Sequence, residues 1–382
     1  MKRNTFLMLL ITWVVGFVTV FQWRIQDRAG NEEFSLTDDG RILVPIAAFT
    51  EKTCEPKQKI GFLKMHKCAS TTLQNIFLRY AHINDLNVIL PLRRWNYLGS
   101  PELFSLKLVN DTPWHHLGYD IMALHTRWDH SAVKQALGGD PIFVTIIREP
   151  VDLFESLYSY YSLYSFFEKT NLYEFLDKLE DEKFKRKNDR FVGKIGRNQM
   201  LFDLGFPVKD FGKEDKLKDF VDGVERKFDL VMIKEKMEES IVLLKHLLCW
   251  EYKDLVYLKL NSRAQNEKKK LSVNQADKLR KWLKADNYLY MKLRAVFDRK
   301  VEQFGYKKME EEKKKLSSVT KQIMEGCLSG KKKPAGENLI QEMRKSAGCR
   351  LFALDEYSFL DEIKIAQWKR ADKKELQSVG SR

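Results

Sequence analysis

The stretch FLKMHKCASTT, residues 62–72, begins as an apolar run and changes abruptly to lysines, a histidine and small hydroxyl residues. Residues 59–65, KIGFLKM, are typical of a buried β-strand, and residues 72–80 have the pattern of the helix that follows it. The first turn of a helix has unpaired N–H groups and a partial positive charge, so this unit can hold a phosphate. A polar exit from a core strand is the alternative, and the stretch alone does not exclude it.

The chemistry of this loop favours an anion. Ala69 and Ser70 are small enough to let the backbone approach a phosphate, and Thr71 and Thr72 add hydroxyl donors. Lys67 supplies a full positive charge. The loop lacks the G-x-x-x-x-G-K-[ST] spacing of a Walker A motif, because its lysine precedes the small residues. A nucleotide or sugar kinase is therefore a distant alternative.

A second candidate for anion binding lies in residues 143–161, FVTIIREPVDLFESLYSYY. The predicted strand ends at Arg148, and Ser156 lies on the helix that follows. A guanidinium at the carboxyl end of a strand, with a hydroxyl on the next helix, can hold a second anionic group. The alternative is a structural ion pair between Arg148 and Glu149 or Glu155.

The order of apolar segments predicts an α/β fold. Besides the strand at 59–65, short apolar runs occur at residues 119–125, 141–147, 228–234 and 255–260, with helix-like segments between them. Strands that alternate with helices favour a mainly parallel sheet flanked by helices. After residue 261 the pattern becomes helical and charged, which predicts a helical C-terminal part.

The N-terminus predicts a membrane anchor. Residues 6–23 are apolar and uncharged, and two basic residues precede them, so we expect an uncleaved signal anchor with the N-terminus in the cytoplasm. A cleaved signal peptide is the alternative, but no small-x-small cleavage site follows the run. The predicted layout is a cytoplasmic tail at 1–5, a transmembrane helix at 6–23, a stem at 24–56 and a lumenal domain at 57–382.

Composition indicates the class of protein and the kinds of partner that it suits. The 382 residues are 44% hydrophobic, as in a globular protein, and a net charge of +14 suits a polyanion, an anionic lipid or a nucleotide co-substrate. Basic residues recur beside acidic ones along the chain, so the net charge does little to distinguish among these partners. The sequon Asn110-Asp111-Thr112 is a candidate glycosylation site.

The cysteines fit an oxidising compartment. No two of the five have CxxC spacing, which argues against a zinc or thioredoxin-like site. In a lumenal domain disulfides are expected, and an odd number leaves one thiol unpaired. We expect Cys68 to be that thiol, with bridges among Cys54, Cys249, Cys327 and Cys349.

Several segments resemble one family in the same order. FLKMHKCASTT resembles the 5′-phosphosulfate loop of the galactose-3-O-sulfotransferases, and IIREPVDLFESLYSYY is similar to their 3′-phosphate segment. NQMLFDLGF (198–206), VMIKEKMEESIVLLKHLLCW (231–250) and VYLKLNSR (256–263) are similar to later blocks of that family, and the resemblance covers about residues 57–365. It implies a P-loop-like sulfotransferase fold and 3′-phosphoadenosine 5′-phosphosulfate (PAPS) as the donor.

The resemblance also implies roles for individual residues. The loop lysine would contact the 5′-phosphate and stabilise the leaving group, while the arginine after the second strand would hold the 3′-phosphate. A second lysine of the loop, Lys64, would strengthen the positive field; a solvated strand-end lysine is the alternative for it. The donor-binding residues implied in this way are Lys64, Lys67, Ser70, Thr71, Thr72, Arg148 and Ser156.

An acceptor hydroxyl needs a general base, and histidine suits that role. His125 ends the predicted strand at 119–125 and matches a histidine of the family pattern, so we expect it to be the base. His66 is the second candidate, and Arg127 is expected to bind the acceptor or the sulfonate. No pair of aspartates resembling a metal site stands beside the loop, so no obligatory metal is expected.

These expectations combine into one function. The sequence predicts a single-pass type II Golgi membrane enzyme that moves a sulfonate from PAPS to a sugar hydroxyl. The 3-hydroxyl of a terminal galactose, on a glycolipid resembling galactosylceramide or on a glycoprotein glycan, is the expected acceptor. A sulfotransferase for another glycan, such as a glycosaminoglycan, and a non-catalytic membrane-anchored glycan-binding protein are the alternatives. No nucleic-acid partner is expected.

Overall fold

The computed structural model describes residues 54–187, 189–191, 193–258, 271–327, 337–346 and 348–380, together with two short strands. Those strands are β1 (Ser35–Leu36) and β2 (Ile42–Leu43), which pair with each other. The predicted tail, the predicted membrane span at 6–23 and most of the predicted stem lie outside the described residues. Within the described part, none of the helices is both long and apolar enough to cross a bilayer.

A parallel sheet of four strands forms the centre of the fold. Its order is β10-β7-β3-β5, and each neighbouring pair runs parallel. The strands are β3 (Ile60–Leu63), β5 (Ile121–Met122), β7 (Ile142–Ile147) and β10 (Leu230–Ile233). Their apolar, β-branched residues are almost all buried, as expected for a parallel sheet with both faces covered. The predicted mainly parallel sheet is confirmed.

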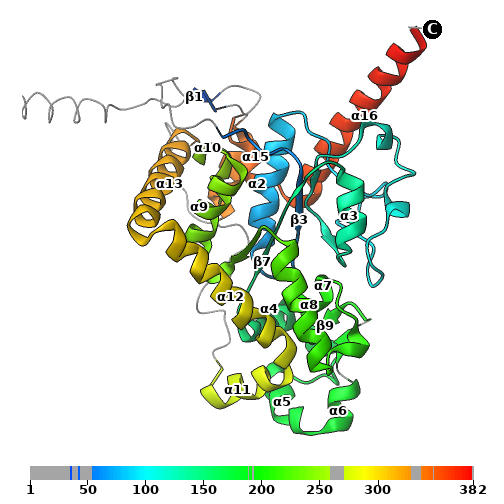
Figure 1. The fold of residues 1–382 in the computed structure, drawn as a ribbon, viewed down its shortest axis with the longest axis vertical. Helices are drawn as coiled ribbons and strands as arrows, with labels where there is room; N and C mark the ends of the chain where they lie inside the picture. The colour runs from blue at the N-terminus through cyan, green and yellow to red at the C-terminus, as the bar shows by residue number, and fades with distance from the viewer. Residues whose placement is uncertain are drawn as a thin grey trace, which may run out of the picture.

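Helices cover this sheet on both sides. Figure 1 shows α2, α9 and α13 on one side of β3, with α3 on the other. The helices that surround the sheet are α2 (Ser70–Ile83), α3 (His130–Leu137), α4 (Pro150–Tyr160), α7 (Gln199–Asp203), α8 (Glu214–Lys227), α9 (Met237–Leu248) and α12 (Lys284–Phe304). The smaller elements are α5 (Leu172–Asp177), α6 (Glu182–Lys187), α10 (Tyr252–Leu255), α11 (Val273–Trp282), β8 (Arg190–Phe191) and β9 (Ile195–Gly196).

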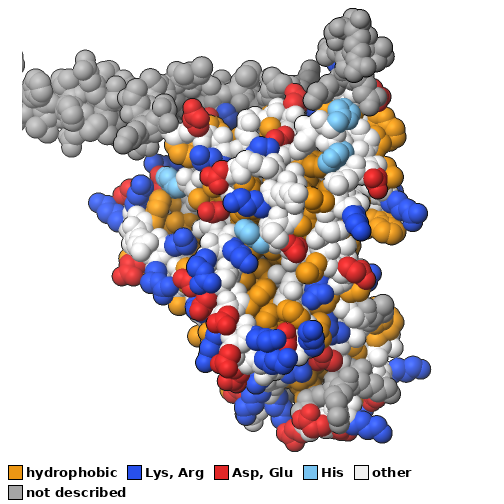
Figure 2. All heavy atoms as spheres, turned by 45° about the vertical axis from the view of Figure 1, so that its right-hand side comes forward, with side chains coloured by type: hydrophobic (Ala, Val, Ile, Leu, Met, Phe, Trp, Pro, Cys, Tyr) orange, Lys and Arg blue, Asp and Glu red, His pale blue; other side chains and the backbone are white. Residues whose placement is uncertain are grey.

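The C-terminal part is helical, as predicted. It consists of α13 (Tyr306–Cys327), α14 (Glu337–Lys345), α15 (Arg350–Ala353) and α16 (Glu356–Gly380). The far end of α16 extends beyond the body of the molecule in Figure 1. Lys and Arg side chains are interspersed with Asp and Glu on the face that Figure 2 shows, so no single basic patch dominates it.

Two sequence predictions about strands need correction. The prediction of a strand at 255–260 is wrong for the described residues 255–258. Leu255 ends the short helix α10, and a capping box formed by Glu251 and Asp254 stabilises the start of that helix. The strand predicted at 119–125 is divided. Only Ile121–Met122 joins the central sheet, whereas β6 (His125–Thr126) pairs with β4 (Tyr97–Leu98) in a separate two-stranded sheet.

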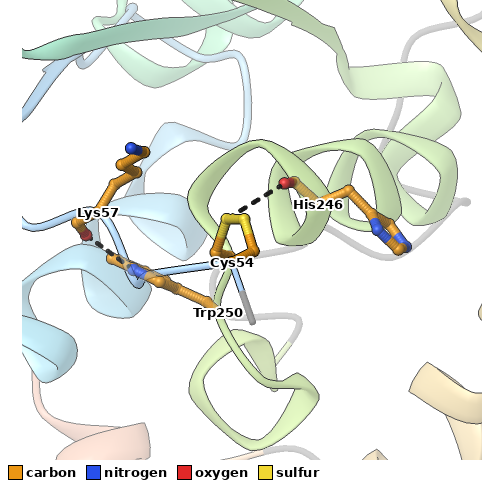
Figure 3. Close-up of a disulfide and its surroundings, with 5 residues drawn as sticks. Cys54, Lys57, His246 and Trp250 are labelled. Carbon is orange, nitrogen blue, oxygen red and sulfur yellow. Dashed lines mark hydrogen bonds between the residues drawn. A yellow bond between two sulfur atoms is a disulfide. The ribbon is translucent and has the colours of Figure 1, made fainter. Parts of the chain in front are cut away.

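The disulfides follow the expected division of the cysteines. Cys54 is bonded to Cys249 and Cys327 to Cys349, whereas Cys68 is free and buried. The first bond joins the segment before β3 to the end of α9, as Figure 3 shows. Beside it, Trp250 Nε1 donates to the carbonyl oxygen of Lys57 at 2.9 Å. This bond and the disulfide together fix the entry into the first strand of the sheet.

Candidate active site

The loop between β3 and α2 has an unusual backbone. Lys67 (φ 53°) and Ala69 (φ 60°) both adopt left-handed conformations, which are uncommon for non-glycine residues. Ala69 is the N-cap of α2, and no side chain caps the helix there. The Thr72 N–H donates to the Ala69 carbonyl oxygen at 3.1 Å, so the N–H groups of Ser70 and Thr71 are the ones that suit an anion.

The side chains of this loop divide into two groups. Lys67 is partly exposed, and its Nζ lies 3.5 Å from the ring centroid of Tyr160, a cation–π contact that keeps the ammonium beside the loop. Thr71 is partly exposed and Thr72 is buried at the start of α2. The Ser70 hydroxyl, in contrast, donates to the carbonyl oxygen of Met65 and stabilises the loop itself.

The Lys64 side chain forms an internal ion pair, which the sequence did not predict. Its side chain is 1% exposed, and Nζ lies 2.5 Å from Oε1 of Glu356 at the start of α16. Burial lowers the pKa of the Lys64 ammonium, and the neighbouring Glu356 carboxylate offsets part of that effect. The structure therefore assigns the Lys64 charge to an internal ion pair, which sequence reasoning did not foresee.

Arg148 follows β7 and reaches the same loop. Its Nη1 donates to the carbonyl oxygen of Lys67 at 3.0 Å, which links the two predicted anion-binding elements. Its Nε is buried without a hydrogen-bond partner, so this donor suits an acceptor supplied by a ligand. Ser156 lies buried on α4. Glu149 does not pair with Arg148 but caps α4, accepting from the N–H of Asp152 at 2.9 Å.

His125 has the geometry of a general base. Its Nδ1 lies 2.8 Å from the carbonyl oxygen of Lys64. A carbonyl can only accept, so Nδ1 carries the proton and Nε2 keeps its lone pair. Burial holds the pKa of His125 well below its ordinary value, and the charges of Lys64 and His66 lower it further. The imidazole is therefore neutral at neutral pH and able to accept a proton.

His66 is held in a separate network. Its Nδ1 lies 2.7 Å from Oδ2 of Asp203 on α7, and its Nε2 lies 2.6 Å from the Tyr97 hydroxyl. Its ring stacks on that of His125 with centroids 4.4 Å apart. The rings of His66 and His125 therefore stack on each other but hydrogen-bond to different partners. Tyr97 also hydrogen-bonds to Tyr161, whose pKa burial raises to about 12.

Sequence reasoning did not find the partners of His66. Asp203 lies within NQMLFDLGF, a segment that resembles a family block, but nothing local indicated its contact with a loop 137 positions earlier. Tyr97 had no signal in the sequence. Its contact depends on β4 pairing with β6, which puts Tyr97 opposite His125.

Arg127 and Asn110 are the remaining predicted residues. Arg127 donates from Nη1 to the carbonyl oxygen of Pro101 and from Nη2 to that of Phe206, so both terminal nitrogens hold the fold together. Its Nε, like that of Arg148, is buried without a hydrogen-bond partner, so the predicted contact with an acceptor stays a prediction. Asn110 is exposed, and the Thr112 hydroxyl of its sequon is buried against Val109. The described residues contain no group of three or more potential metal ligands.

Comparisons with known proteins identify the family of this chain. The family model for galactose-3-O-sulfotransferases matches residues 2–346. The human galactosylceramide sulfotransferase is 34% identical over 285 residues, which cover 72% of this chain and 66% of that protein, just under two thirds. The mouse galactose-3-O-sulfotransferase 3 is 33% identical over 298 residues (75% and 67%), and the pig galactose-3-O-sulfotransferase 2 is 30% identical over 318 (81% and 78%). This chain belongs to the galactose-3-O-sulfotransferase family.

Proposed function

We propose that this protein transfers a sulfonate from PAPS to the 3-hydroxyl of a terminal galactose, on a glycolipid such as galactosylceramide or on a glycoprotein glycan. One observation carries the proposal. Two candidate anion-binding loops follow neighbouring strands of the sheet, the Arg148–Lys67 hydrogen bond joins them, and the buried His125 donates from Nδ1 to the Lys64 carbonyl oxygen of the first loop. The names of the relatives support galactose as the acceptor sugar.

The residues present fit a donor that has two separate phosphate groups. The N-terminus of α2 and Lys67 would hold the 5′-phosphosulfate, in the manner of a P-loop-like fold. Arg148, with its unpartnered buried Nε, and Ser156 would hold the 3′-phosphate. A nucleotide that lacks the 3′-phosphate would leave that buried Nε without an acceptor, so the site would favour PAPS over it.

The proposed reaction is an in-line displacement at sulfur. The acceptor oxygen forms a bond to sulfur while its proton moves to Nε2 of His125. The bond between sulfur and the bridging phosphate oxygen breaks, and its electron pair stays with the departing 3′-phosphoadenosine 5′-phosphate. Lys67 and the first N–H groups of α2 neutralise the charge that develops on that phosphate. The imidazolium then returns its proton to solvent.

The membrane location is part of the same proposal. We infer a type II Golgi membrane protein anchored by residues 6–23, from the uncharged apolar run and the basic residues before it. The two disulfides suit an oxidising lumen. Protease protection of intact Golgi vesicles tests the orientation: we expect the folded domain to survive until detergent is added, and cleavage without detergent would contradict it.

An acceptor panel tests the function. The full-length protein in detergent is incubated with sulfur-35-labelled PAPS and with galactosylceramide, an N-acetyllactosamine-terminated oligosaccharide or chondroitin. We expect label in one or both galactose-terminated acceptors. Label in chondroitin alone would favour a glycosaminoglycan sulfotransferase. Glycan binding without any transfer would favour the non-catalytic alternative, and either result would overturn the proposal.

A further inference from the structure

The C-terminal helix α16 is anchored close to the central sheet. Gln367, fully buried, accepts a hydrogen bond from the Val88 N–H at 2.7 Å and donates to the Val88 carbonyl at 3.1 Å. Arg370 donates to the Leu86 carbonyl at 3.2 Å. Val88 in turn forms a bridge to Ile121 of β5. The helix lies beyond residue 346, where the match to the family model ends, so that match assigns it no role.

The first residue of this helix reaches the active-site loop. The Glu356 carboxylate lies 2.5 Å from the Lys64 ammonium, and the side chains are 15% and 1% exposed. The two residues are 292 positions apart in the sequence. A buried ammonium is costly unless a counter-charge accompanies it, so Glu356 holds the Lys64 side chain where it lies.

Lys64 in turn supports the candidate base. Its carbonyl oxygen is the group that accepts from Nδ1 of His125, at 2.8 Å. The Lys64 side chain is therefore fixed by α16 while its backbone fixes the imidazole. If Lys64 lost its counter-charge, it would either shed its proton or move toward solvent. Movement would displace the carbonyl that selects the His125 tautomer.

We propose that Glu356 is a positioning residue for sulfonate transfer: by pairing with Lys64, it keeps the Lys64 carbonyl in place, so that His125 stays protonated on Nδ1 and offers Nε2 to the acceptor. The proposal rests on the proposed function for the role of His125. It makes α16, a helix distant in sequence, part of the active site.

The kinetic test compares three variants of the full-length protein. Glu356→Gln removes the charge at nearly constant shape and lowers kcat at saturating donor and acceptor by at least about tenfold. The Kd for 3′-phosphoadenosine 5′-phosphate stays within about threefold, because Lys67 and Arg148 are untouched. Glu356→Asp keeps the charge and recovers part of the lost kcat. Asp361→Asn is the matched control, since Asp361 on the same helix pairs with the exposed Arg94 at 2.7 Å, and its kcat stays within about twofold.

A spectroscopic readout separates this proposal from the proposed function. Nitrogen-15 NMR of histidine-labelled protein reports the tautomer without any acceptor. We expect the Nδ1-protonated neutral form of His125 in the wild type and in Asp361→Asn, and a mixture of tautomers in Glu356→Gln. A wild type that shows this tautomer but transfers nothing would refute the proposed function alone.

Three results would overturn the role of Glu356. The first is a Glu356→Gln variant with the wild-type His125 tautomer and the wild-type kcat. The second is an Asp361→Asn variant that loses as much kcat as Glu356→Gln does. The third is a Glu356→Gln variant whose affinity for the nucleotide falls in proportion to its kcat. If Glu356→Gln does not fold, Glu356→Asp takes its place, because the shorter side chain loosens the pair without removing the charge. A Glu356→Asp variant with unchanged kcat and an unchanged tautomer would then refute the proposal.

Discussion

Replacing His125 by asparagine should abolish most of the transfer without harming donor binding. The asparagine amide can still donate to the Lys64 carbonyl, which now accepts from Nδ1 at 2.8 Å, but it has no basic nitrogen. A positioned general base contributes about 10²- to 10⁴-fold, so the transition state should lose about 3 to 5 kcal/mol of stabilisation.

The assay measures kcat with saturating PAPS and galactosylceramide, and the Kd for 3′-phosphoadenosine 5′-phosphate by calorimetry. We expect kcat to fall by at least about 10²-fold and the Kd to change by less than about threefold. His130→Asn is the matched control. His130 is the first residue of α3 and packs against Phe143 of β7, outside the site. A His125→Asn enzyme that kept more than a tenth of the wild-type kcat would refute the assignment of His125 as the base.

The same histidine determines the pH dependence. Burial and the Lys64 charge keep the pKa of His125 well below 6.5, so the acidic limb of kcat/KM should lie below pH 6.5 and activity should be flat through neutral pH. The unfolded chain binds a proton on this residue at a higher pH than the folded chain does. The free energy of unfolding should therefore fall as pH drops below 6.5 and level off below the folded-state pKa. An acidic limb above pH 7 would contradict this assignment.

Three further substitutions test the donor-binding residues and one turn of the fold. Lys67→Met should lower kcat by about 10²- to 10³-fold, because a charge on the leaving phosphate is no longer neutralised, and an unchanged kcat in steady-state assays would count against that role. Arg148→Met should weaken the binding of 3′-phosphoadenosine 5′-phosphate by about 10- to 100-fold in calorimetry. It should weaken the binding of 5′-AMP less, because that ligand loses only the support that the Arg148 hydrogen bond gives to the Lys67 loop; equal losses for both ligands would argue against a 3′-phosphate contact. Gly205→Ala should reduce the free energy of unfolding by at least about 2 kcal/mol in urea, because Gly205 has φ +93° and a Cβ there would lie 2.2 Å from the Trp128 carbonyl oxygen. A neutral effect would mean that this turn relaxes easily.

Local patterns in the sequence were sufficient for the central sheet and for much of the site. The runs at residues 59–65 and 141–147 contain β3 and β7, and the residues that follow both strands meet in space because parallel neighbours end at the same edge. Arg148 follows β7 and donates to the Lys67 carbonyl oxygen, so the two loops do meet, whereas His125 begins the separate strand β6 and does not end a strand of the central sheet.

Contacts between segments far apart in the chain could not be predicted from the sequence. Glu356 meets Lys64 only because α16 packs against the body of the fold, and no periodicity reports which loop a helix start will touch. Asp203 approaches His66 for a similar reason. The strand predicted at 255–260 was wrong because an apolar run alone does not distinguish a strand from a short capped helix.

The position of the sulfate in the product tests the central claim most directly. The full-length enzyme is incubated with PAPS and galactosylceramide, and the product is analysed by proton NMR. We expect a single sulfate ester on the galactose, with the H3 resonance shifted strongly downfield and the other ring protons little changed. A sulfate at another carbon, or no sulfated galactoside from an enzyme that binds the donor, would contradict the account.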